Sequence, residues 1–232
     1  MKSLIVGFFS LFYQANMNHE NMQGTGFAFL IRKAAALNGI SLEVKKVFEQ
    51  TAYFHTHPYL VNFIAGVWVK EFEQNGEEDF YKKTYSSAFG AFGDSFFWHS
   101  LRPLSFVIAA IAGLYNPWLG LIVYLVFYNS FHLIFRFAGY SIGYALGKEV
   151  IVFFNRIGFN RWPMYFDVAS AFFFGIMLSY LAKSCSDFDS VVLGILTVYV
   201  LTGMALAKKL DIVLGLVINM ILTGFFLFIT GA

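Results

Sequence analysis

The sequence has little of what a soluble protein of its size needs. Only 13% of its 232 residues are charged and 58% are hydrophobic, whereas average soluble domains carry about 25% charged residues. So few charges cannot cover a soluble globule, and so many apolar residues exclude a disordered chain. The single cysteine, Cys185, excludes an intrachain disulfide and a cysteine-based zinc cluster. A net charge of +2 provides no basic field for nucleic acid.

What is abundant is apolar and aromatic, with 30 phenylalanines among the residues. The composition therefore predicts an all-α integral membrane protein embedded in a lipid bilayer. Residues 1–102 hold 18 charged groups and residues 103–232 hold 12. We predict an N-terminal core of interfacial, re-entrant and broken helices over residues 1–155, followed by about three transmembrane helices over 156–232.

Residues 103–135 contain no charged side chain. At about 1.5 Å per residue this run is longer than one span of about 30 Å. Because proline cannot continue a helical ladder, Asn116-Pro117 divides it. The pieces Pro103–Tyr115, too short to span, and Trp118–Phe135, barely long enough, predict a broken helix or a re-entrant hairpin.

Three clearer spans are predicted at the C-terminal end, namely Trp162–Ala182, Ser190–Ala207 and Ile212–Ala232. Basic residues flank them unevenly, and the positive-inside rule places Arg156, Arg161, Lys208 and Lys209 in the cytoplasm. The C-terminus is then expected outside.

The first half of the sequence has a different pattern of charged and apolar residues. Met1–Tyr13 has a lysine and an apolar run without a convincing cleavage site, and we interpret it as a retained, membrane-touching helix rather than a signal peptide. Ala34–Phe54 mixes charged and apolar residues like an interfacial helix. Tyr59–Phe72 is apolar but too short to span, and Gln74–Lys83 is predicted as a solvated loop.

The phenylalanines of this half are expected at the membrane interface or against a partner protein. They are Phe8, Phe9, Phe12, Phe27, Phe29, Phe54, Phe63, Phe89, Phe92, Phe96 and Phe97.

Polar side chains near hydrocarbon are costly and are candidates for function. Residues 18–24, with Asn18, Glu20 and Gln23, suit either a sugar or a turn before the following helix. His55 and His57 form either a weak metal pair or, more simply, a turn before Pro58 with His57 bonded inward.

A second set of polar residues lies further along the chain. Asp94 beside Ser95 and His99 invites a hydrolase triad, but no nucleophile elbow is present, and a helix cap or a ligand acceptor fits better. Arg102-Pro103 has three interpretations: the arginine binds a carboxylate, it caps a broken helix, or it snorkels to the edge of the membrane.

Residues at helical spacing follow. Asn129, His132 and Arg136 share one helix face and are predicted to face the protein interior or a wet cavity. Gly139, Gly143 and Gly147 form a smooth stripe suited to close helix packing.

Four segments in this order resemble the IID membrane subunit of the mannose/fructose/sorbose-type sugar phosphotransferase system (PTS). They are NHENMQGTGFAFLI (18–31), FHTHPYLVNFIAGV (54–67), GAFGDSFFWHSLRP (90–103) and FYNSFHLIFRFAGYSIGYALGKEV (127–150). His55 departs from the family, which usually carries asparagine there.

The resemblance implies a partner, the IIC membrane subunit, with which IID assembles as a trimer of heterodimers in the bacterial inner membrane. Together they carry a hexose-type sugar inward, and cytoplasmic IIB, phosphorylated by IIA, phosphorylates it. IID itself would hold no catalytic group, metal or cofactor.

On these motifs we predict a sugar lining of Asn18, Glu20, Gln23, His57 and Asp94. Residues expected to fix or gate the broken helices are Arg102, Pro103, Pro117, Asn129, His132 and Arg136. The family's longer exterior loop is represented only by Lys183–Ser190, so a structural or regulatory partner that no longer transports is the alternative. An autonomous intramembrane enzyme with His55 and His57 as metal ligands is a third reading.

Overall fold

The structure, a computed structural model, describes residues 1–75, 79–184 and 221. The chain divides into two compact units, Met1–Met177 and Leu178–Ala232, and nearly all described residues belong to the first. Its α-helices are α1 (Lys2–Phe9), α2 (Gly24–Leu37), α3 (Val44–Glu49), α4 (Val61–Asn75), α5 (Asp79–Gly93), α6 (Arg102–Tyr115), α7 (Pro117–Leu146), α8 (Val150–Arg156) and α9 (Trp162–Ser184). The short 3-10 helices are η1 (Ser10–Phe12), η3 (Gly147–Glu149) and η4 (Phe159–Arg161), and η2 (Asp94–Leu101) is a π-helix. Within the described ranges there is no β-strand, which agrees with the predicted all-α class.

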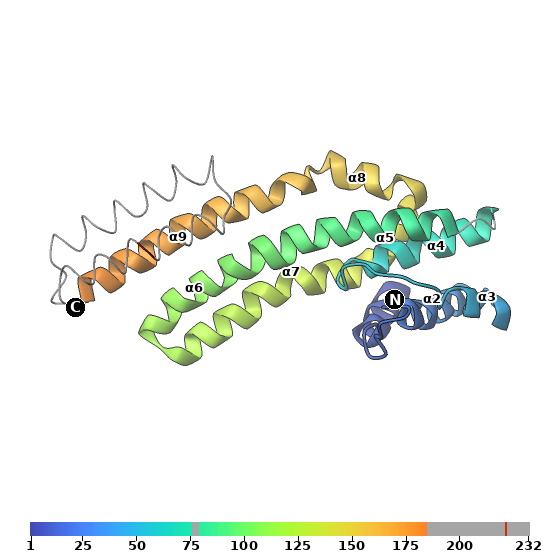
Figure 1. The fold of residues 1–232 in the computed structure, drawn as a ribbon, viewed down its shortest axis with the longest axis horizontal. Coiled ribbons are helices and arrows are strands. Elements are labelled where there is room, and N and C mark those ends of the chain that lie inside the picture. The colour runs from blue at the N-terminus through green and yellow to red at the C-terminus, as the bar shows by residue number, and fades with distance from the viewer. Residues whose placement is uncertain (76–78, 185–220, 222–232) are drawn as a thin grey trace. The chain divides into compact units, whose positions relative to one another are not determined.

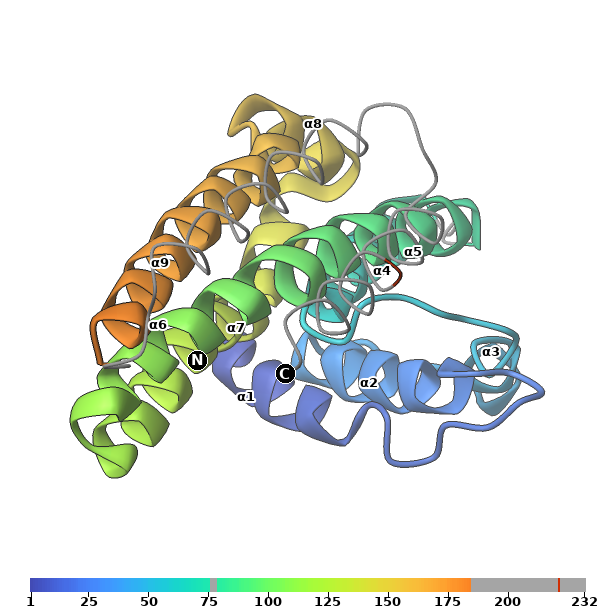
Figure 2. The same cartoon turned by 60° about the vertical axis from the view of Figure 1, so that its left-hand side comes forward.

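The most prominent feature is a long helical hairpin, in which α6 and α7 run side by side (Figures 1 and 2). The turn falls at the predicted break. The Asn116 side chain accepts hydrogen bonds from the backbone nitrogens of Trp118 and Leu119, at 2.8 and 3.4 Å, so it caps the start of α7. Gly120 permits close approach, because a Cβ there would lie 2.7 Å from the carbonyl oxygen of Ala109.

The prediction of two short pieces is wrong. α5, η2 and α6 are continuous, and the chain has two helical stretches long and apolar enough to cross a membrane, Lys82–Tyr115 and Pro117–Arg156, among the described residues. Pro103 does not stop the first stretch. The preceding residues of η2 form a wider π-helix, so the lost N–H and the proline ring are accommodated where the helix narrows again.

The N-terminal half also differs from two sequence predictions. The interfacial helix predicted over Ala34–Phe54 is interrupted: α2 ends at Leu37, Gly39 takes a positive φ of 79°, and α3 is short. The solvated loop predicted over Gln74–Lys83 contains the start of α5, where Lys82 is buried.

α4 is the central helix of the first unit. All ten residues from Leu60 to Val69 are buried, and α4 packs against α2, α5 and α7. Gly66 lets α4 approach α7, since a Cβ there would lie 2.4 Å from the carbonyl oxygen of Tyr140. The apolar run that is too short to span a bilayer is therefore covered by protein.

Many phenylalanines form this core. Phe154 has ring centroids of Phe63, Phe89 and Phe159 within 5.1 Å. Several rings that were expected at the interface are instead fully buried, namely Phe27, Phe54, Phe63, Phe89, Phe96 and Phe97. Phe8, Phe12 and Phe29 are exposed, as that expectation requires.

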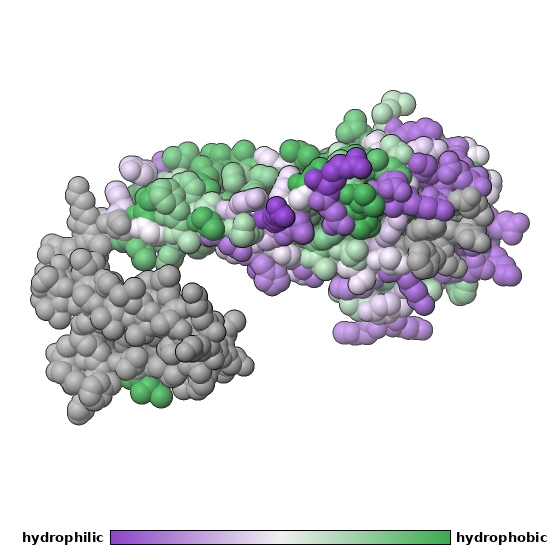
Figure 3. Space-filling model, turned by 90° about the horizontal axis from the view of Figure 1, so that it is seen from above, coloured by the Kyte–Doolittle hydropathy of each residue, from purple (hydrophilic) through white to green (hydrophobic). Residues whose placement is uncertain are grey.

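The outer surface is divided. Hydrophobic side chains dominate the end of the described chain that carries the α6–α7 turn, and hydrophilic ones gather at the other end (Figure 3). Exposed apolar residues on α6 and α7 include Phe106, Trp118, Ile122, Val126 and Ile134. The predicted span Trp162–Ala182 lies within α9. The spans Ser190–Ala207 and Ile212–Ala232 lie outside the described residues, apart from Ile221.

Candidate functional site

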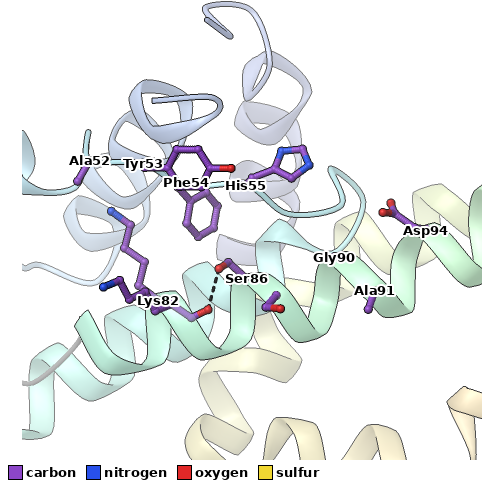
Figure 4. Close-up of a pocket in the computed structure, with 11 residues that line it drawn as sticks. Ala52, Tyr53, Phe54, His55, Lys82, Ser86, Gly90, Ala91 and Asp94 are labelled. Atoms are coloured by element: carbon purple, nitrogen blue, oxygen red, sulfur yellow. Dashed lines mark hydrogen bonds between the residues drawn. The ribbon is translucent and has the colours of Figure 1, made fainter. Parts of the chain in front are cut away.

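A groove of about 710 Å³ opens between the loop that follows α3 and one face of α5 (Figure 4). Its lining residues are Ala52, Tyr53, Phe54, His55, Lys82, Lys83, Ser86, Ser87, Gly90, Ala91 and Asp94. Lys82 on α5 lies at one end of the groove and Asp94, the first residue of η2, lies at the other. The groove thus combines aromatic rings, hydroxyls, one carboxylate and basic groups.

Gln23 holds the loops that form this groove. Its side-chain oxygen accepts hydrogen bonds from the Tyr13 hydroxyl at 2.6 Å and the Thr56 backbone nitrogen at 2.9 Å. Its backbone nitrogen donates to the Phe54 carbonyl oxygen. Burial raises the pKa of Tyr13, which keeps the hydroxyl protonated and able to donate. Gln23, predicted as a sugar ligand, is therefore a buried connector of three segments.

Asn18 and Glu20 lie on an exposed turn before Gln23 and do not line the groove. The Asn18 side-chain oxygen accepts from the backbone nitrogens of Glu20 and Asn21, both at 3.0 Å. Met22 then adopts a left-handed φ of 53°, unusual for a residue with a side chain. This turn orients Gln23 toward Phe54.

The groove's basic end depends on Lys82. Its ammonium donates to the Gln50 carbonyl oxygen at 3.0 Å and lies 5.5 and 5.8 Å from the ring centroids of Phe27 and Phe54. Those two rings stack with centroids 4.0 Å apart. Lys82 thereby ties α5 to α2 and to the loop, which sequence reasoning missed because the lysine sits beside a run of charged residues.

Asp94 is half-buried and lines the far end of the groove. It is not a helix cap as the sequence suggested, because Gly93 before it is itself helical and no side-chain capping bond forms. The Asp94 backbone carbonyl contacts Nδ1 of the exposed His99 at 2.8 Å.

The structure separates the two histidines of the His-Thr-His-Pro segment. His55 is exposed at the groove, whereas His57 is buried in an aromatic cluster. The His57 ring is stacked on Phe97, with centroids 5.0 Å apart, and meets Tyr59 edge-on at 4.8 Å. Residues 1–75 and 79–184 contain no group of three or more side chains that could hold a metal.

His57 is a neutral residue in this setting. Burial, followed by the positive charge of Arg136, lowers the pKa of His57 from 6.5 to about 3. Nδ1 accepts a long hydrogen bond from the Tyr59 backbone nitrogen at 3.4 Å. Gly93 makes room for the imidazole, because a Cβ there would lie 2.2 Å from the His57 Cβ.

The polar residues of α7 converge on the same cluster from the other side. Arg136 is buried, and its Nη1 donates to the carbonyl and hydroxyl oxygens of Ser10. Asn62 donates to the Ser10 hydroxyl at 3.0 Å and to the Arg136 carbonyl at 2.6 Å. This network joins η1, α4 and α7.

Tyr59 links that network to His57. The His132 ring is stacked on Tyr59 with centroids 4.5 Å apart, and the Arg136 guanidinium lies 5.4 Å from the Tyr59 ring centroid. Sequence reasoning missed Tyr59, Ser10 and Asn62, since nothing in their local sequence distinguishes them from core residues.

Two of the predicted gating residues lie apart from this network. Asn129 donates only to the Leu125 carbonyl one turn earlier on α7, and Arg102 is exposed at the start of α6.

The glycine stripe lies against α4. A Cβ on Gly143 would lie 2.2 Å from the Phe63 carbonyl oxygen, and one on Gly139 would lie 2.9 Å from the Phe63 ring. Gly147 ends α7 with a φ of 56°, a conformation that favours glycine.

Fold and site together define an all-α membrane protein in which a polar groove adjoins a long helical hairpin. The family model for the IID component of the PTS system mannose/fructose/sorbose family matches residues 2–231. The chain therefore belongs to this family of sugar-transport components, as the four sequence motifs indicated.

Curated relatives agree. Over 150 residues the chain is 26% identical to the PTS system mannose-specific EIID component of Escherichia coli strain K12, covering 60% of this chain and 53% of the relative. The identically named protein of Escherichia coli O157:H7 matches equally well. The chain spans about half the length of the curated relatives it matches.

Two solved structures share the fold across 99% of this chain and 96% of theirs. One, titled "Structure of membrane protein", has a TM-score of 0.67 at 17% identity. The other has a TM-score of 0.56 at 20% identity and is titled "CryoEM Structure of Mannose Transporter ManYZ and Microcin E492 (MceA) complex".

Proposed function

We propose that the chain pairs with a IIC membrane subunit to carry a hexose-type sugar across the bacterial inner membrane. A cytoplasmic IIB subunit, phosphorylated by IIA, phosphorylates the arriving sugar and so prevents its return. Family membership and the likeness to a chain of a mannose transporter complex support this role. IID contributes binding and movement, and the phosphoryl chemistry belongs to IIA and IIB.

The observation that carries the proposal is the groove. His55 and Asp94 come from two separate motifs, 39 positions apart in sequence, yet both line one cavity. The Asp94 carboxylate accepts hydrogen bonds from adjacent sugar hydroxyls, and the exposed Tyr53 ring covers an apolar face of the sugar.

The other predicted sugar residues act around this groove. Gln23 holds its walls in place, and neutral His57 supports the start of η2, on which Asp94 stands. Asn18 and Glu20, on the exposed turn, face the IIC subunit and complete the site there. His132 and Arg136 anchor the hairpin against which the core moves.

The assembly is a trimer of IIC–IID heterodimers, with the C-terminus of IID outside. Pro117 sets the start of the second hairpin segment in the bilayer, whereas Pro103 lies inside the first segment, where η2 passes into α6. Translocation follows from rocking of the N-terminal core with the sugar bound, as in transporters that alternate access around a fixed site.

Uptake of labelled hexoses tests the proposal in cells that supply IIA, IIB and IIC. Asp94→Asn keeps the side-chain shape but removes the charge, and we expect a 10- to 100-fold weaker apparent sugar affinity, about the strength of one hydrogen bond to a charged group. Asp167→Asn, exposed on α9, is the matched control and leaves uptake unchanged.

Full uptake by Asp94→Asn with unchanged affinity would remove Asp94 from the sugar site. A chain that assembles with IIC but supports no hexose uptake and shows no sugar-dependent thermal shift would favour the non-transporting partner instead. Phosphorylation of sugar by the purified chain alone would favour an autonomous enzyme.

A further inference from the structure

The outer surface of α1, η1 and α2, here called the α1–α2 surface, is apolar. Leu4, Phe8, Leu11 and Phe12 are each at least half exposed, and Phe29 of α2 is exposed beside them. The opposite side of α1 packs on α7, where Gly7 lies against Phe137 and the Ser3 hydroxyl donates to the Phe137 carbonyl oxygen. This helix therefore has one face in the protein and one large apolar face outward.

A groove of about 310 Å³ runs across this surface. Its lining residues are Phe12, Ala15, Asn16, Thr25, Gly26 and Phe29. The Thr25 hydroxyl donates to the Asn16 carbonyl oxygen at 3.1 Å, so these two groups satisfy each other. What the groove offers a ligand is apolar, and burying methylene groups there is favourable.

The charge beside the groove is positive. The Lys33 ammonium lies 5.0 and 5.8 Å from the ring centroids of Phe9 and Phe29, and those rings meet edge-to-face at 5.8 Å. Phe29 thus forms the groove wall and also places the ammonium next to it. Neither Lys33 nor Arg32 forms a salt bridge with a carboxylate in the described part of the chain. The only acidic residue in positions 1–42 is Glu20.

The position of α1 along the hairpin matches the depth of lipid headgroups. Tyr115 and Trp118, both strongly exposed at the α6–α7 turn, are residues that favour a membrane interface. From Trp118, about 20 residues of helix cover the bilayer's hydrocarbon core of about 30 Å. That length ends near Phe137, where α1 crosses α7. α1 therefore lies at the opposite interface.

From these features we propose that the α1–α2 surface binds an anionic phospholipid, with an acyl chain in the groove beside Phe12 and Phe29 and the headgroup phosphate on Lys33 and Arg32. A lysine ammonium and an arginine guanidinium are both suited to a lipid phosphate. The cationic site prefers a lipid with net negative charge over a zwitterionic one.

The test uses the full chain, purified in detergent and titrated with phosphatidylglycerol or phosphatidylcholine, with bound lipid counted by native mass spectrometry. We expect phosphatidylglycerol to bind more tightly than phosphatidylcholine. The variant Arg32→Gln/Lys33→Gln should lose about fivefold in phosphatidylglycerol affinity for each charge removed. Phe12→Ser/Phe29→Ser should weaken both lipids, because it removes the apolar walls.

The matched control is Lys45→Gln/Arg156→Gln, which removes two exposed charges elsewhere and should leave lipid preference unchanged. The variant Arg32→Lys/Lys33→Arg changes the same two positions but keeps both charges, and it should retain binding. Its binding would show that the loss in the glutamine variant comes from the missing charges and not from a folding defect. Equal binding of the two lipids by the unaltered chain would overturn the proposal, as would an equal loss in the control.

A protein occupant is tested separately. With Phe8→Trp in the chain assembled with IIC, brominated phosphatidylglycerol should quench the additional tryptophan fluorescence. Absence of that quenching would mean that a protein covers the surface, and would overturn the lipid assignment.

Discussion

Two helices of this protein carry apolar runs in opposite surroundings. In α4, the nine residues from Val61 to Val69 are buried by other helices. In α7, only 6% of the most apolar window is buried within the protein. In the sequence they differ mainly in the length of the apolar run. The difference is that α4 is covered by α2, α5 and α7, whereas the outer face of the α6–α7 hairpin is left for lipid or a partner.

The polar residues follow the same division. Around α4 they bond to one another, as in the network of Ser10, Asn62 and Arg136, in which only the buried atoms Asn62 Oδ1 and Arg136 Nε lack a hydrogen-bond partner among the described residues. Toward the turn, Asn129 reaches only the backbone of its own helix. Buried polar groups must be satisfied within the protein, so removing a partner should cost much more near α4 than near the turn.

The largest effect is expected from Arg136→Ala. It removes the two buried hydrogen bonds that the guanidinium donates to Ser10, so unfolding should become easier by about 3 kcal/mol. Arg102→Ala, at an exposed arginine, should change stability by less than about 0.5 kcal/mol. Thermal or denaturant unfolding in detergent measures both, and equal effects would contradict the division.

Gly143→Ala should also destabilise the protein strongly. The added Cβ would lie 2.2 Å from the Phe63 carbonyl oxygen, and such overpacking costs about 1–3 kcal/mol. A Cβ on Gly175 of α9 would meet no atom of the described residues within 4 Å, and Gly175→Ala should stabilise its helix by about 0.5–1 kcal/mol. Shifts of opposite sign in the unfolding midpoints of the two variants would support the difference between the packed and the open helix face. An unchanged midpoint for Gly143→Ala would contradict it.

The stability of the buried region around α4 should be sensitive to acid through His57. The pKa of His57 in the folded protein is about 3, below the ordinary 6.5. The free energy of unfolding therefore has its full value above pH 6.5, where His57 is neutral in both states, and it decreases as the pH falls toward 3. The loss approaches about 1.4 kcal/mol per pH unit within that window. His57→Gln should flatten the profile between pH 6.5 and 5, measured by unfolding at each pH. An unchanged slope would assign the acid sensitivity to another group.

The smallest effect is expected at the turn of the hairpin. Asn116→Ala removes the cap of α7 and should cost about 1 kcal/mol. Asn155→Ala, exposed on α8, is the matched control and should be within about 0.5 kcal/mol of the starting protein. A larger loss at Asn116 than at Arg136 would reverse the order argued above.

Much of the architecture could be predicted from local sequence. The charge-free run of residues 103–135 predicted a helical hairpin, although with pieces shorter than the observed helices, and Asn116-Pro117 predicted its turn, since both depend on residue type alone. The prediction of a short separate piece that begins at Pro103 was wrong, because a wider π-helix before the proline accommodates the missing hydrogen bond. The interfacial helix over Ala34–Phe54 failed at Gly39, whose positive φ ends α2.

The candidate site was predicted less well. Asp94 does line a groove, whereas Gln23 and His57 are buried supports and Asn18 is exposed. Lys82 and Tyr59 were missed, because their roles depend on rings and carbonyls distant in sequence.

The sequence by itself determined that this is an all-α membrane protein and, through four motifs, its family. These properties follow from composition, from proline and asparagine chemistry, and from residue order. Only the tertiary structure decided which apolar helix is protein core and which polar residues meet. Burial depends on what packs against a helix, and a groove such as that of His55 and Asp94 exists only once separate segments have been brought together.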